Sequence, residues 1–594
     1  MGGILGCIGS DGVRAAETLA RMRFAPAAQG RELRRVSSAA VAVFGERDAD
    51  IAEDVDRREL LAISGYVRLR GRPSSAAAVL AAWRTKGEGI LDALSGEFAL
   101  AALVGGRFVV ARDALGTRPM YVAELPRGGV AFSTSMFALL YAGARPDVDH
   151  DAVVRSLVLG YPTAPGTAVA SVRQLGPGEI RELSPAQTTR RWFVPAEHLD
   201  AKRSLAAAAR AVDRSLTDAV RDAVPQGSRV AAFLSGGLDS SIVLARLHEL
   251  GTPVEAFTLS FGDRFPGEMR YARAVAKHLG VRQHVLELSA RRFCDGIPRA
   301  VEHLEDVVSE TIAVPNFLLA GEAAKTADTL FTGEGGDQSF GGPKNVGMAL
   351  AHAYGSHPAA PPLAHAYLSQ HPYFWSDLDR ALEPHVLAAF DPEKLADDVA
   401  RRFFDDRIHR TGSFVGRVMI ANTVIKGGHY ILLKAAKMIG FAHDLALRSP
   451  LYDRRLVELA GTIPPWQKLD GTEEKLVLRR AALRSLPQWV VDRPKRGMML
   501  PMGFWFAHEL GALARDVLTE RAVRERGLLR WSYVERLLAH APPSRHPDRL
   551  RLLDQLWVAL MTELHHRSID RIAGEARALA APRIPGEEAV HVPA

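Results

Sequence analysis

The sequence is poor in cysteine: its 594 residues contain only Cys7 and Cys294. Two thiols can build neither a disulfide framework nor a cysteine-rich metal site, and this scarcity is typical of a reducing cytosol. The sequence also lacks a continuous apolar run long enough to span a bilayer, and its first residues lack the basic segment and apolar core of a signal peptide. We therefore expect a cytoplasmic protein without a membrane partner.

A long basic tract is also missing, although the net charge is +7. Arg-Arg pairs are scattered along the chain, among them 34–35, 190–191, 401–402 and 479–480, which is typical of solvated helix surfaces. We therefore expect no nucleic-acid partner. Internal repeats and low-complexity tracts are absent too. The length allows two or three domains, and nothing in the sequence fixes the oligomeric state, which leaves a homodimer open.

The first 195 residues contain short β-like runs separated by turn residues. Helical stretches at Arg14–Arg21 and Ala76–Trp83 interrupt these runs. This pattern predicts a layered α/β domain over 1–195, built on antiparallel sheets. The expected strands are Ala39–Phe44, Ala62–Leu69, Gly96–Leu103, Arg107–Ala111 and Gly129–Ser133.

From about residue 200 the pattern changes to amphipathic helical stretches that alternate with short apolar strands. Such alternation predicts parallel βαβ units in a doubly wound sheet, whose ligands bind beyond the carboxyl ends of the strands. We expect this domain to span 205–570, with a mostly helical part over 375–565. Residues 571–594 are expected to form a mobile tail. The expected helices are Ser204–Val224 and Tyr271–Leu279, and the strands are Val230–Leu234, Val254–Phe261 and Thr329–Phe331.

Residues 235–241 read Ser-Gly-Gly-Leu-Asp-Ser-Ser, between the apolar run 230–234 and the helical stretch 242–246. A strand, a glycine-rich turn and a helix in this order are typical of a phosphate site, because free amides at the helix start point at the anion. No lysine follows the glycines, so this is not the nucleotide loop that ends in Gly-Lys-Ser/Thr. Asp239 would repel phosphate in this loop, unless a magnesium ion bridges its carboxylate to the phosphate. The predicted phosphate-holding residues are Ser235, Gly236, Gly237, Asp239, Ser240 and Ser241.

A second glycine-rich segment, 332–338, follows the apolar pair Leu330-Phe331 and contains two acids three residues apart. Asp337 can share the magnesium ion, while Glu334 can accept a proton from an amine nucleophile. Farther along, Lys475 lies in an amphipathic helical run, where a cation can neutralise phosphate or a developing oxyanion. Most lysines on such helices are surface residues, so the pattern alone does not favour this role.

Taken together, these segments resemble the asparagine synthetase B family, whose synthetase half belongs to the ATP pyrophosphatase superfamily. The matching segments run in the family's order and cover most of the chain. They are Ser235–Ser241, the adenine-side strand Thr258–Gly262, Gly333–Asp337, Arg448–Asp453, Lys475, and, in the N-terminal half, Leu94–Ala99 and Ala111–Tyr121.

The resemblance implies an N-terminal Ntn-hydrolase-like αββα domain followed by an ATP pyrophosphatase domain. It also implies ATP and Mg²⁺ as cofactors, adenylation of a carboxylate with release of pyrophosphate, and transfer of the acyl group to an amine. Glu334 and Lys475 would be catalytic, and Asp239 and Asp337 would hold the metal. The adenosine site would be lined by Leu234, Leu259, Ser260, Phe261, Thr332 and Gly333.

The N-terminal half departs from the family pattern at the residues that glutamine hydrolysis requires. Working members begin Met-Cys-Gly-Ile, whereas this chain has Gly2 at the position of the nucleophile. The family's glutamine-binding Asn-Gly-Glu reads Ser64-Gly65-Tyr66, and the acid expected nearby is missing from 74–77. Cys7 would need a new register to replace the missing thiol. We therefore expect an inactive glutaminase domain, as in β-lactam synthetases and lasso-peptide macrolactam synthetases.

If the amine does not come from glutamine, we expect the amide bond to be part of an antibiotic or another natural product. Glu334 argues against a β-lactam product, because β-lactam synthetases tend to carry an aromatic residue there. Gln338 and the run 343–345 depart from the family pattern, which disfavours aspartate as substrate. The alternatives are macrolactam or β-lactam ring closure, an ammonia-using or glutamine-using asparagine synthetase, a tRNA-modifying ATP pyrophosphatase and a non-catalytic nucleotide-binding scaffold. The identities of the carboxylate and the amine stay open, as does whether one molecule carries both.

Overall fold

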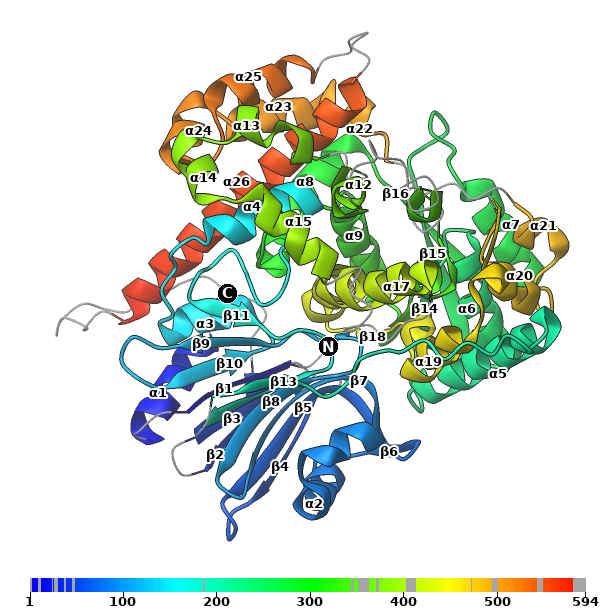
Figure 1. The fold of residues 1–594 in the computed structure, drawn as a ribbon, viewed down its shortest axis with the longest axis horizontal. Helices are drawn as coiled ribbons and strands as arrows, with labels where there is room; N and C mark the ends of the chain where they lie inside the picture. The colour runs from blue at the N-terminus through cyan, green and yellow to red at the C-terminus, as the bar shows by residue number, and fades with distance from the viewer. Residues whose placement is uncertain are drawn as a thin grey trace.

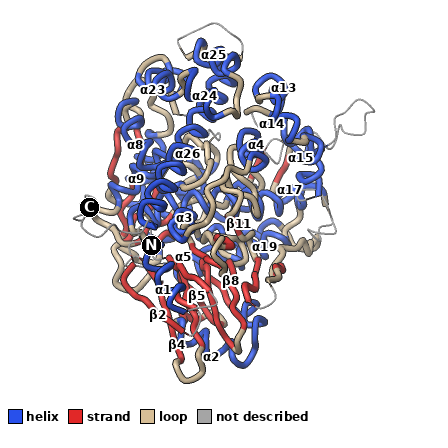
Figure 2. Tube along the Cα trace, turned by 90° about the vertical axis from the view of Figure 1, so that its left-hand side faces the viewer, coloured by secondary structure: helices blue, strands red, loops and turns tan. Residues whose placement is uncertain are grey.

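The computed structural model describes residues 3–8, 12–23, 25, 30–36, 39–44, 49–184, 187–342, 347–350, 363–369, 373–401, 413–471, 473–493, 500–541 and 548–580. Gly2 and the run 343–345, which the sequence singled out, lie outside these residues. In Figure 1 the N-terminal sheets lie below the helical parts of the chain, and Figure 2 shows the same separation from the side.

Two antiparallel sheets form the N-terminal domain. In the first the strand order is β11-β9-β10-β1-β3-β2, and in the second it is β13-β12-β8-β7-β5-β4, with β6 paired to β5. The first sheet contains β1 Gly3–Ile8, β2 Gly30–Val36, β3 Ala39–Phe44, β9 Tyr121–Glu124, β10 Val130–Ser133 and β11 Val172–Gln174. The second contains β4 Ala49–Asp54, β5 Glu59–Leu69, β6 Arg72–Ser74, β7 Leu94–Val104, β8 Arg107–Arg112, β12 Glu179–Ser184 and β13 Thr189–Arg191.

The two sheets pack face to face because alternate residues of each strand are apolar and point to the same side. Val41 of β3, Val110 of β8 and Phe132 of β10 belong to the cluster between them. Helix α2 (Ala76–Lys86) covers the second sheet through Val79 and Trp83. Helices α1 (Gly12–Met22) and α3 (Met136–Ala142) cover the first. The αββα layering inferred from the family resemblance is confirmed. After α4 (His150–Leu159) the chain returns to the two sheets through β11, β12 and β13.

The second domain is built on a five-stranded parallel sheet with the order β16-β15-β14-β17-β18. Its strands are β14 Val230–Phe233, β15 Val254–Ser260, β16 Gln283–Glu287, β17 Thr329–Phe331 and β18 Ala446–Arg448. One face packs against α5 Leu205–Ala223, α6 Leu238–Glu249 and α7 Met269–Leu279. The other packs against α8 Ala290–Leu304 and α9 Ala313–Ala323. The doubly wound parallel sheet is therefore confirmed.

The remainder is mostly helical, as predicted, and includes a π-helical stretch η4 (Asn422–Ile431) that continues into α18 (Leu432–Ala435) and η5 (Ala436–Phe441). Its other helices are α10 Gly336–Phe340, α12 Leu363–Ser369, α13 Leu378–Ala381, α14 Pro384–Ala389, α15 Pro392–Val399, α17 Phe414–Ala421, α19 Arg454–Thr462, α20 Leu476–Ala482, α21 Gln488–Val491, α22 Met502–Phe506, α23 Glu509–Val517, α24 Glu520–Arg526, α25 Trp531–Ala539 and α26 Arg549–Ala580. A short hairpin, β19 (Leu469–Asp470) and β20 (Glu473–Glu474), precedes α20.

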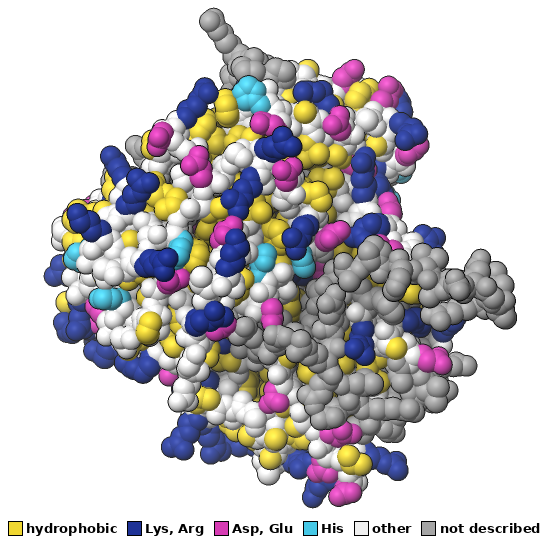
Figure 3. Space-filling model, turned by 180° about the vertical axis from the view of Figure 1, so that it is seen from behind, with side chains coloured by type: hydrophobic (Ala, Val, Ile, Leu, Met, Phe, Trp, Pro, Cys, Tyr) yellow, Lys and Arg dark blue, Asp and Glu magenta, His cyan; other side chains and the backbone are white. Residues whose placement is uncertain are grey.

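Helix α26 corrects the expected start of the tail at residue 571. It continues to Ala580 because Ile572 and Ala576 are buried in the core, and the Tyr141 hydroxyl of α3 donates to Glu575 over 2.6 Å. Residues 581–594 lie outside the described part. None of the helices that the structure describes has the length and hydropathy needed to cross a membrane. On the face shown in Figure 3, basic and acidic side chains are interspersed.

Candidate active site at the carboxyl ends of the parallel strands

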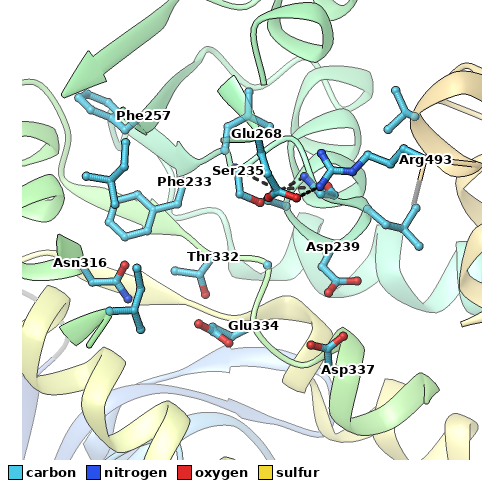
Figure 4. Close-up of a pocket in the computed structure, with 18 of the residues that line it drawn as sticks. Phe233, Ser235, Asp239, Phe257, Glu268, Asn316, Thr332, Glu334, Asp337 and Arg493 are labelled. Carbon is cyan, nitrogen blue, oxygen red and sulfur yellow. Dashed lines mark hydrogen bonds and ion pairs between the residues drawn. The ribbon is translucent and has the colours of Figure 1, made fainter. Parts of the chain in front are cut away.

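A cavity of about 310 Å³ lies beyond the carboxyl ends of β14, β15 and β17. Its lining comes from the loop after β14, the segment after β17, helix α9 and the region around α20 (Figure 4). This is the place where an open parallel sheet binds ligands, because successive loops diverge there. Of the predicted site residues, the cavity is lined by Leu234, Ser235, Gly237, Asp239, Ser240, Leu259, Thr332, Gly333, Glu334, Asp337 and Lys475.

The loop after β14 is held open by its own hydroxyl groups. The Ser235 and Ser240 hydroxyls lie 3.0 Å apart, the Ser235 amide donates to the Ser240 oxygen over 3.2 Å, and the Gly237 amide donates to the Ser235 oxygen over 3.2 Å. Gly237 is the N-cap of α6 and provides no side-chain acceptor. The first amides of α6 therefore face the cavity end of the helix without a capping side chain, as an anion site requires.

Two glycines allow this loop to lie against its neighbours. Gly236 has φ +75°, and a Cβ there would lie 2.4 Å from the Ala272 amide nitrogen of α7. A Cβ on Gly333 would lie 2.5 Å from the Ser240 amide nitrogen, so the loops after β14 and β17 meet backbone to backbone. A larger residue at Gly236 would push the loop away from α7, and one at Gly333 would push the two loops apart.

Lys475 lies between the two acids predicted to hold metal. Its Nζ is 2.5 Å from Oδ2 of Asp239 and 2.5 Å from Oδ1 of Asp337. Burial acts to lower the pKa of Lys475, but the charges and hydrogen bonds of the two aspartates outweigh it and raise the pKa. The ammonium is therefore charged, and it places a third charged group at the phosphate end of the cavity.

The donor set suits magnesium bound together with phosphate. Oδ1 of Asp239 is buried without a hydrogen-bond partner among the described residues, so this oxygen can accept a cation. Asp337 faces it across the cavity (Figure 4). In the described part of the chain no cluster of three or more His, Cys, Asp or Glu side chains is arranged for a metal. Magnesium held by two carboxylates takes its remaining oxygens from phosphates and water.

Glu334 points into the same cavity from the loop after β17 (Figure 4). Burial raises the pKa of Glu334, the charge of Lys434 opposes this shift, and the charges of Glu310, Asp337 and Asp239 add to it. Lys434 itself forms an ion pair with Glu310. A carboxyl group with a raised pKa in such a cavity is suited to accept a proton from an amine.

Four predicted residues do not line the cavity. Ser260 accepts a bond from the Gly262 amide over 3.2 Å, and the Phe261 ring packs on Trp505 with centroids 5.9 Å apart. The side chain of Ser241 is buried, with its hydroxyl unpartnered within the described residues. The last of the four, Gly236, shapes the loop from behind. Alternation along β15 points Leu259 into the cavity and Ser260 to the opposite face, while Phe261 lies beyond the end of the strand.

Arg493 is a cavity residue that the sequence reasoning missed. It donates to the Gly236 carbonyl over 2.7 Å, forms an ion pair with Glu268, and lies 4.4 Å from the centre of the Tyr271 ring. A signal was present, since Arg493 opens a run with three cations in residues 493–496. Other lining residues that carried no recognisable motif are Phe233, Phe257, Glu268, Asn316 and Arg479.

The segment Ser64-Gly65-Tyr66 lies on β5 at the boundary between the domains. The Tyr66 ring packs against the core of the second domain, with the Arg448 guanidinium carbon 4.4 Å from its centre. Cys7 lies inside β1, paired with Ala40 and Ala131, and is 3% exposed. Burial raises the pKa of the Cys7 thiol to about 11, despite a hydrogen bond with Thr18 and the charge of Arg21. A buried thiol with this pKa is a poor nucleophile.

Comparison with known proteins gives two family matches. The model described as asparagine synthase matches residues 211–567, more than half of the chain, and the one described as glutamine amidotransferase domain matches residues 61–194. The chain is 24% identical over 503 residues to glutamine-hydrolyzing asparagine synthetase 1 of Bacillus subtilis, covering 80% of this chain and 78% of that protein. It is 28% identical over 464 residues to a putative glutamine-hydrolyzing asparagine synthetase of Mycobacterium bovis (72% and 70%). With amidase chyE of Penicillium rubens it shares 22% identity over 549 residues (80% and 80%).

Proposed function

The chain belongs to the asparagine synthase family of ATP-dependent carbon–nitrogen ligases, and from this premise we propose that it joins a carboxylate to an amine that does not come from glutamine. The amide belongs to an antibiotic or another natural product. The carboxylate and the amine lie on small molecules or peptides, and both the identity of the substrates and intramolecular ring closure are left to experiment.

In the first step, a carboxylate oxygen attacks the α-phosphorus of ATP and pyrophosphate leaves. The amides at the start of α6, the loop hydroxyls and Lys475 receive the charge of the β- and γ-phosphates. Asp239 and Asp337 would hold magnesium, which supplies further positive charge to the leaving pyrophosphate. The Arg493 side chain fixes the loop through the Gly236 carbonyl.

In the second step, the amine nitrogen attacks the carbonyl carbon of the acyl adenylate and AMP leaves. The attacking nitrogen loses a proton, and Glu334 accepts it. A general base works best when its pKa is close to the operating pH. The raised pKa of Glu334 brings this carboxyl group nearer to neutral pH.

The observation that carries the proposal is that the N-terminal domain departs from the family pattern at the groups needed to bind and hydrolyse glutamine. The position of the family's glutamine-binding glutamate holds Tyr66, whose ring is occupied in packing under Arg448. The first thiol of the chain, Cys7, is enclosed within the first sheet. Both features support an amine source other than glutamine hydrolysis. They also favour this reading over a glutamine-using asparagine synthetase.

The test is pyrophosphate release from ATP and magnesium against a panel of carboxylates and short peptides. Each reaction is run with glutamine, with ammonia, with a panel of amines, and with no added nitrogen source. We expect release with one carboxylate class, unchanged by glutamine, and an amide product by mass spectrometry. The variant Cys7→Ala is the matched control, expected to behave as the wild type. Asparagine formed from aspartate and ammonia would favour the second candidate, an ammonia-using asparagine synthetase, and glutamate produced from glutamine would overturn the proposal.

A further inference from the structure

A second cavity lies away from the ATP site, at the edge of the N-terminal sheets. Its volume is about 320 Å³, within the range of small-molecule sites. The lining comes from β11 and the residue after it, from β12 and β13, from residues 164–165 and 193–195, from Val424 and His429 of η4, and from Arg401, which is paired with Asp398. The strands come from the ends of both sheets, so the cavity sits where the edges of the sandwich meet the second domain.

Three arginines from these edge strands line the cavity: Arg173 of β11, Arg181 of β12 and Arg191 of β13. Arg191 meets Glu179 at 3.5 Å. Nε of Arg181 is buried without a hydrogen-bond partner among the described residues. Burial and the charge of Arg173 lower the pKa of Arg181, and Glu124 acts in the opposite direction. Two guanidinium groups are thus held close enough to repel each other.

Gln174, which follows Arg173 on β11, gives an independent sign of a ligand. It lines the cavity, its side chain is 1% exposed, and neither its amide oxygen nor its amide nitrogen has a hydrogen-bond partner within the described residues. Leaving a buried amide unpaired costs about 1–3 kcal/mol. A buried group of this kind is retained when something outside the chain satisfies it.

We propose that this cavity is a second ligand site, which binds a small organic anion with a phosphate or carboxylate group. Arg173 and Arg181 hold the anionic group, since guanidinium forks match the paired oxygens of both. Arg191 carries positive charge at the rim, where Glu179 balances it in part. The Gln174 amide pairs with a polar group next to the anion. The site is separate from the proposed reaction and does not depend on it.

The test is isothermal titration of the full chain with inorganic phosphate, pyrophosphate and citrate in turn. Magnesium and an ATP analogue that cannot be cleaved between the α- and β-phosphates fill the first cavity. The heat of each probe in protein-free magnesium buffer is subtracted, so that the remaining heat reports a different site. We expect one of these probes to bind with one site per chain. Binding of the phosphates without citrate identifies a phosphoryl ligand, and the reverse identifies a carboxylate. If none of the three binds, the proposal is wrong.

Two variants and a control tie the binding to this cavity. Arg181→Met should weaken binding about tenfold or more, because it removes a charge-assisted hydrogen bond. Gln174→Leu should weaken binding and also raise the Tm of the ligand-free protein, because an apolar group replaces an unsatisfied buried amide. Arg282→Met changes an exposed arginine of the second domain and should leave binding unchanged. Equal affinity in the wild type and Arg181→Met would overturn the assignment.

Discussion

The buried Lys475 and the partly buried Asp239 form an ion pair, 2.5 Å between Nζ and Oδ2, that joins the start of helix α20 to the loop after β14. The two residues are 236 positions apart in the sequence, so the pair depends on the folded second domain. A buried charge needs a partner, because its desolvation costs several kcal/mol. Each residue therefore holds the other in place at this end of the cavity.

Replacing Lys475 with Ala should lower the rate of amide formation by more than it lowers ATP affinity. The substitution removes the cation that faces the phosphates, and it leaves Asp239 and Asp337 without their shared partner. Loss of a preorganised charge at such a position typically lowers kcat by about 10²–10³. Single-turnover amide formation and equilibrium binding of a fluorescent ATP analogue measure the two effects separately.

The matched control for this prediction is Lys468→Ala. Lys468 is also a buried lysine next to the same hairpin, but it lines a different, small cavity with Glu197 and Met419. This variant should form amide at a rate near that of the wild type, provided that its circular dichroism spectrum is unchanged. Normal turnover in Lys475→Ala would refute the role given to Lys475.

Replacing Glu334 with Gln should stop amide transfer and leave adenylation in place. The amide side chain of Gln cannot accept the amine proton, whereas ATP and the phosphate loop do not need this carboxylate. Exchange of labelled pyrophosphate into ATP should therefore continue in the variant while amide product is lost. If both activities disappear together, Glu334 acts before the transfer step and not as the base.

The pH dependence of the wild type follows from the same carboxyl group. Burial raises the pKa of Glu334 in the free enzyme, so the acid limb of kcat/KM should lie above the pH at which an ordinary carboxyl group ionises. The rate should rise with pH as Glu334 loses its proton. Measurement of kcat/KM from pH 4.5 to 9 tests this expectation, and Glu334→Asp serves as the control that keeps a carboxylate.

The local parts of the fold could be predicted because their signals are local. Helix α5 was expected at Ser204–Val224 and lies at Leu205–Ala223, where the Ser204 hydroxyl accepts a bond from the Ala207 amide. Strand β17 lies at Thr329–Phe331, as its apolar run indicated. Short strands without a continuous apolar run were missed, and β16 (Gln283–Glu287) is the example, since its pattern is polar and half-exposed.

The site residues that belong to a sequence motif could be predicted. Those that reach the cavity only through contacts between distant parts of the chain could not. The two glycine-rich segments carry their chemistry in adjacent residues, and the cavity brings both together with Lys475. Ser260 and Phe261 were placed on the adenosine side through the family resemblance, yet Ser260 alternates with the cavity residue Leu259, and Phe261, just past the end of β15, packs on Trp505. Arg493 reaches the Gly236 carbonyl from 257 residues away, which no spacing in the sequence encodes.

Replacing Arg493 with Met should weaken ATP binding about tenfold or more. The substitution removes the bond to the Gly236 carbonyl and leaves Glu268 with its charge unpaired beside the phosphates. Loss of one hydrogen bond to a charged group corresponds to about 1.5–3 kcal/mol. Arg270→Met is the control, because Arg270 also stacks on the Tyr271 ring, at 4.6 Å, but does not line the cavity. Titration with an ATP analogue measures the affinity of each variant. An affinity of Arg493→Met equal to that of the wild type would contradict the role of Arg493.

Glu97 should make the stability of the domain boundary depend on pH. Its carboxylate accepts a bond from the Ser449 amide over 2.9 Å and is 8% exposed. Burial raises the pKa of Glu97 from 4.5 to about 6, although the charges of Arg448 and Arg118 oppose the shift. The protonated form therefore favours the folded state. This contribution is fully present below pH 4.5 and is lost as the pH rises through 6, a change of about 2 kcal/mol.

The variant Glu97→Gln isolates this contribution, because Gln keeps the acceptor for the Ser449 amide and cannot ionise. The Tm of the variant minus that of the wild type should therefore increase between pH 4.5 and pH 7, since only the wild type has to bury a carboxylate at the higher pH. Thermal unfolding followed by circular dichroism at several pH values measures this difference. A difference that stays constant with pH would mean that Arg448 and Arg118 compensate the buried charge in full, so that the pKa of Glu97 is the same in the folded and the unfolded protein.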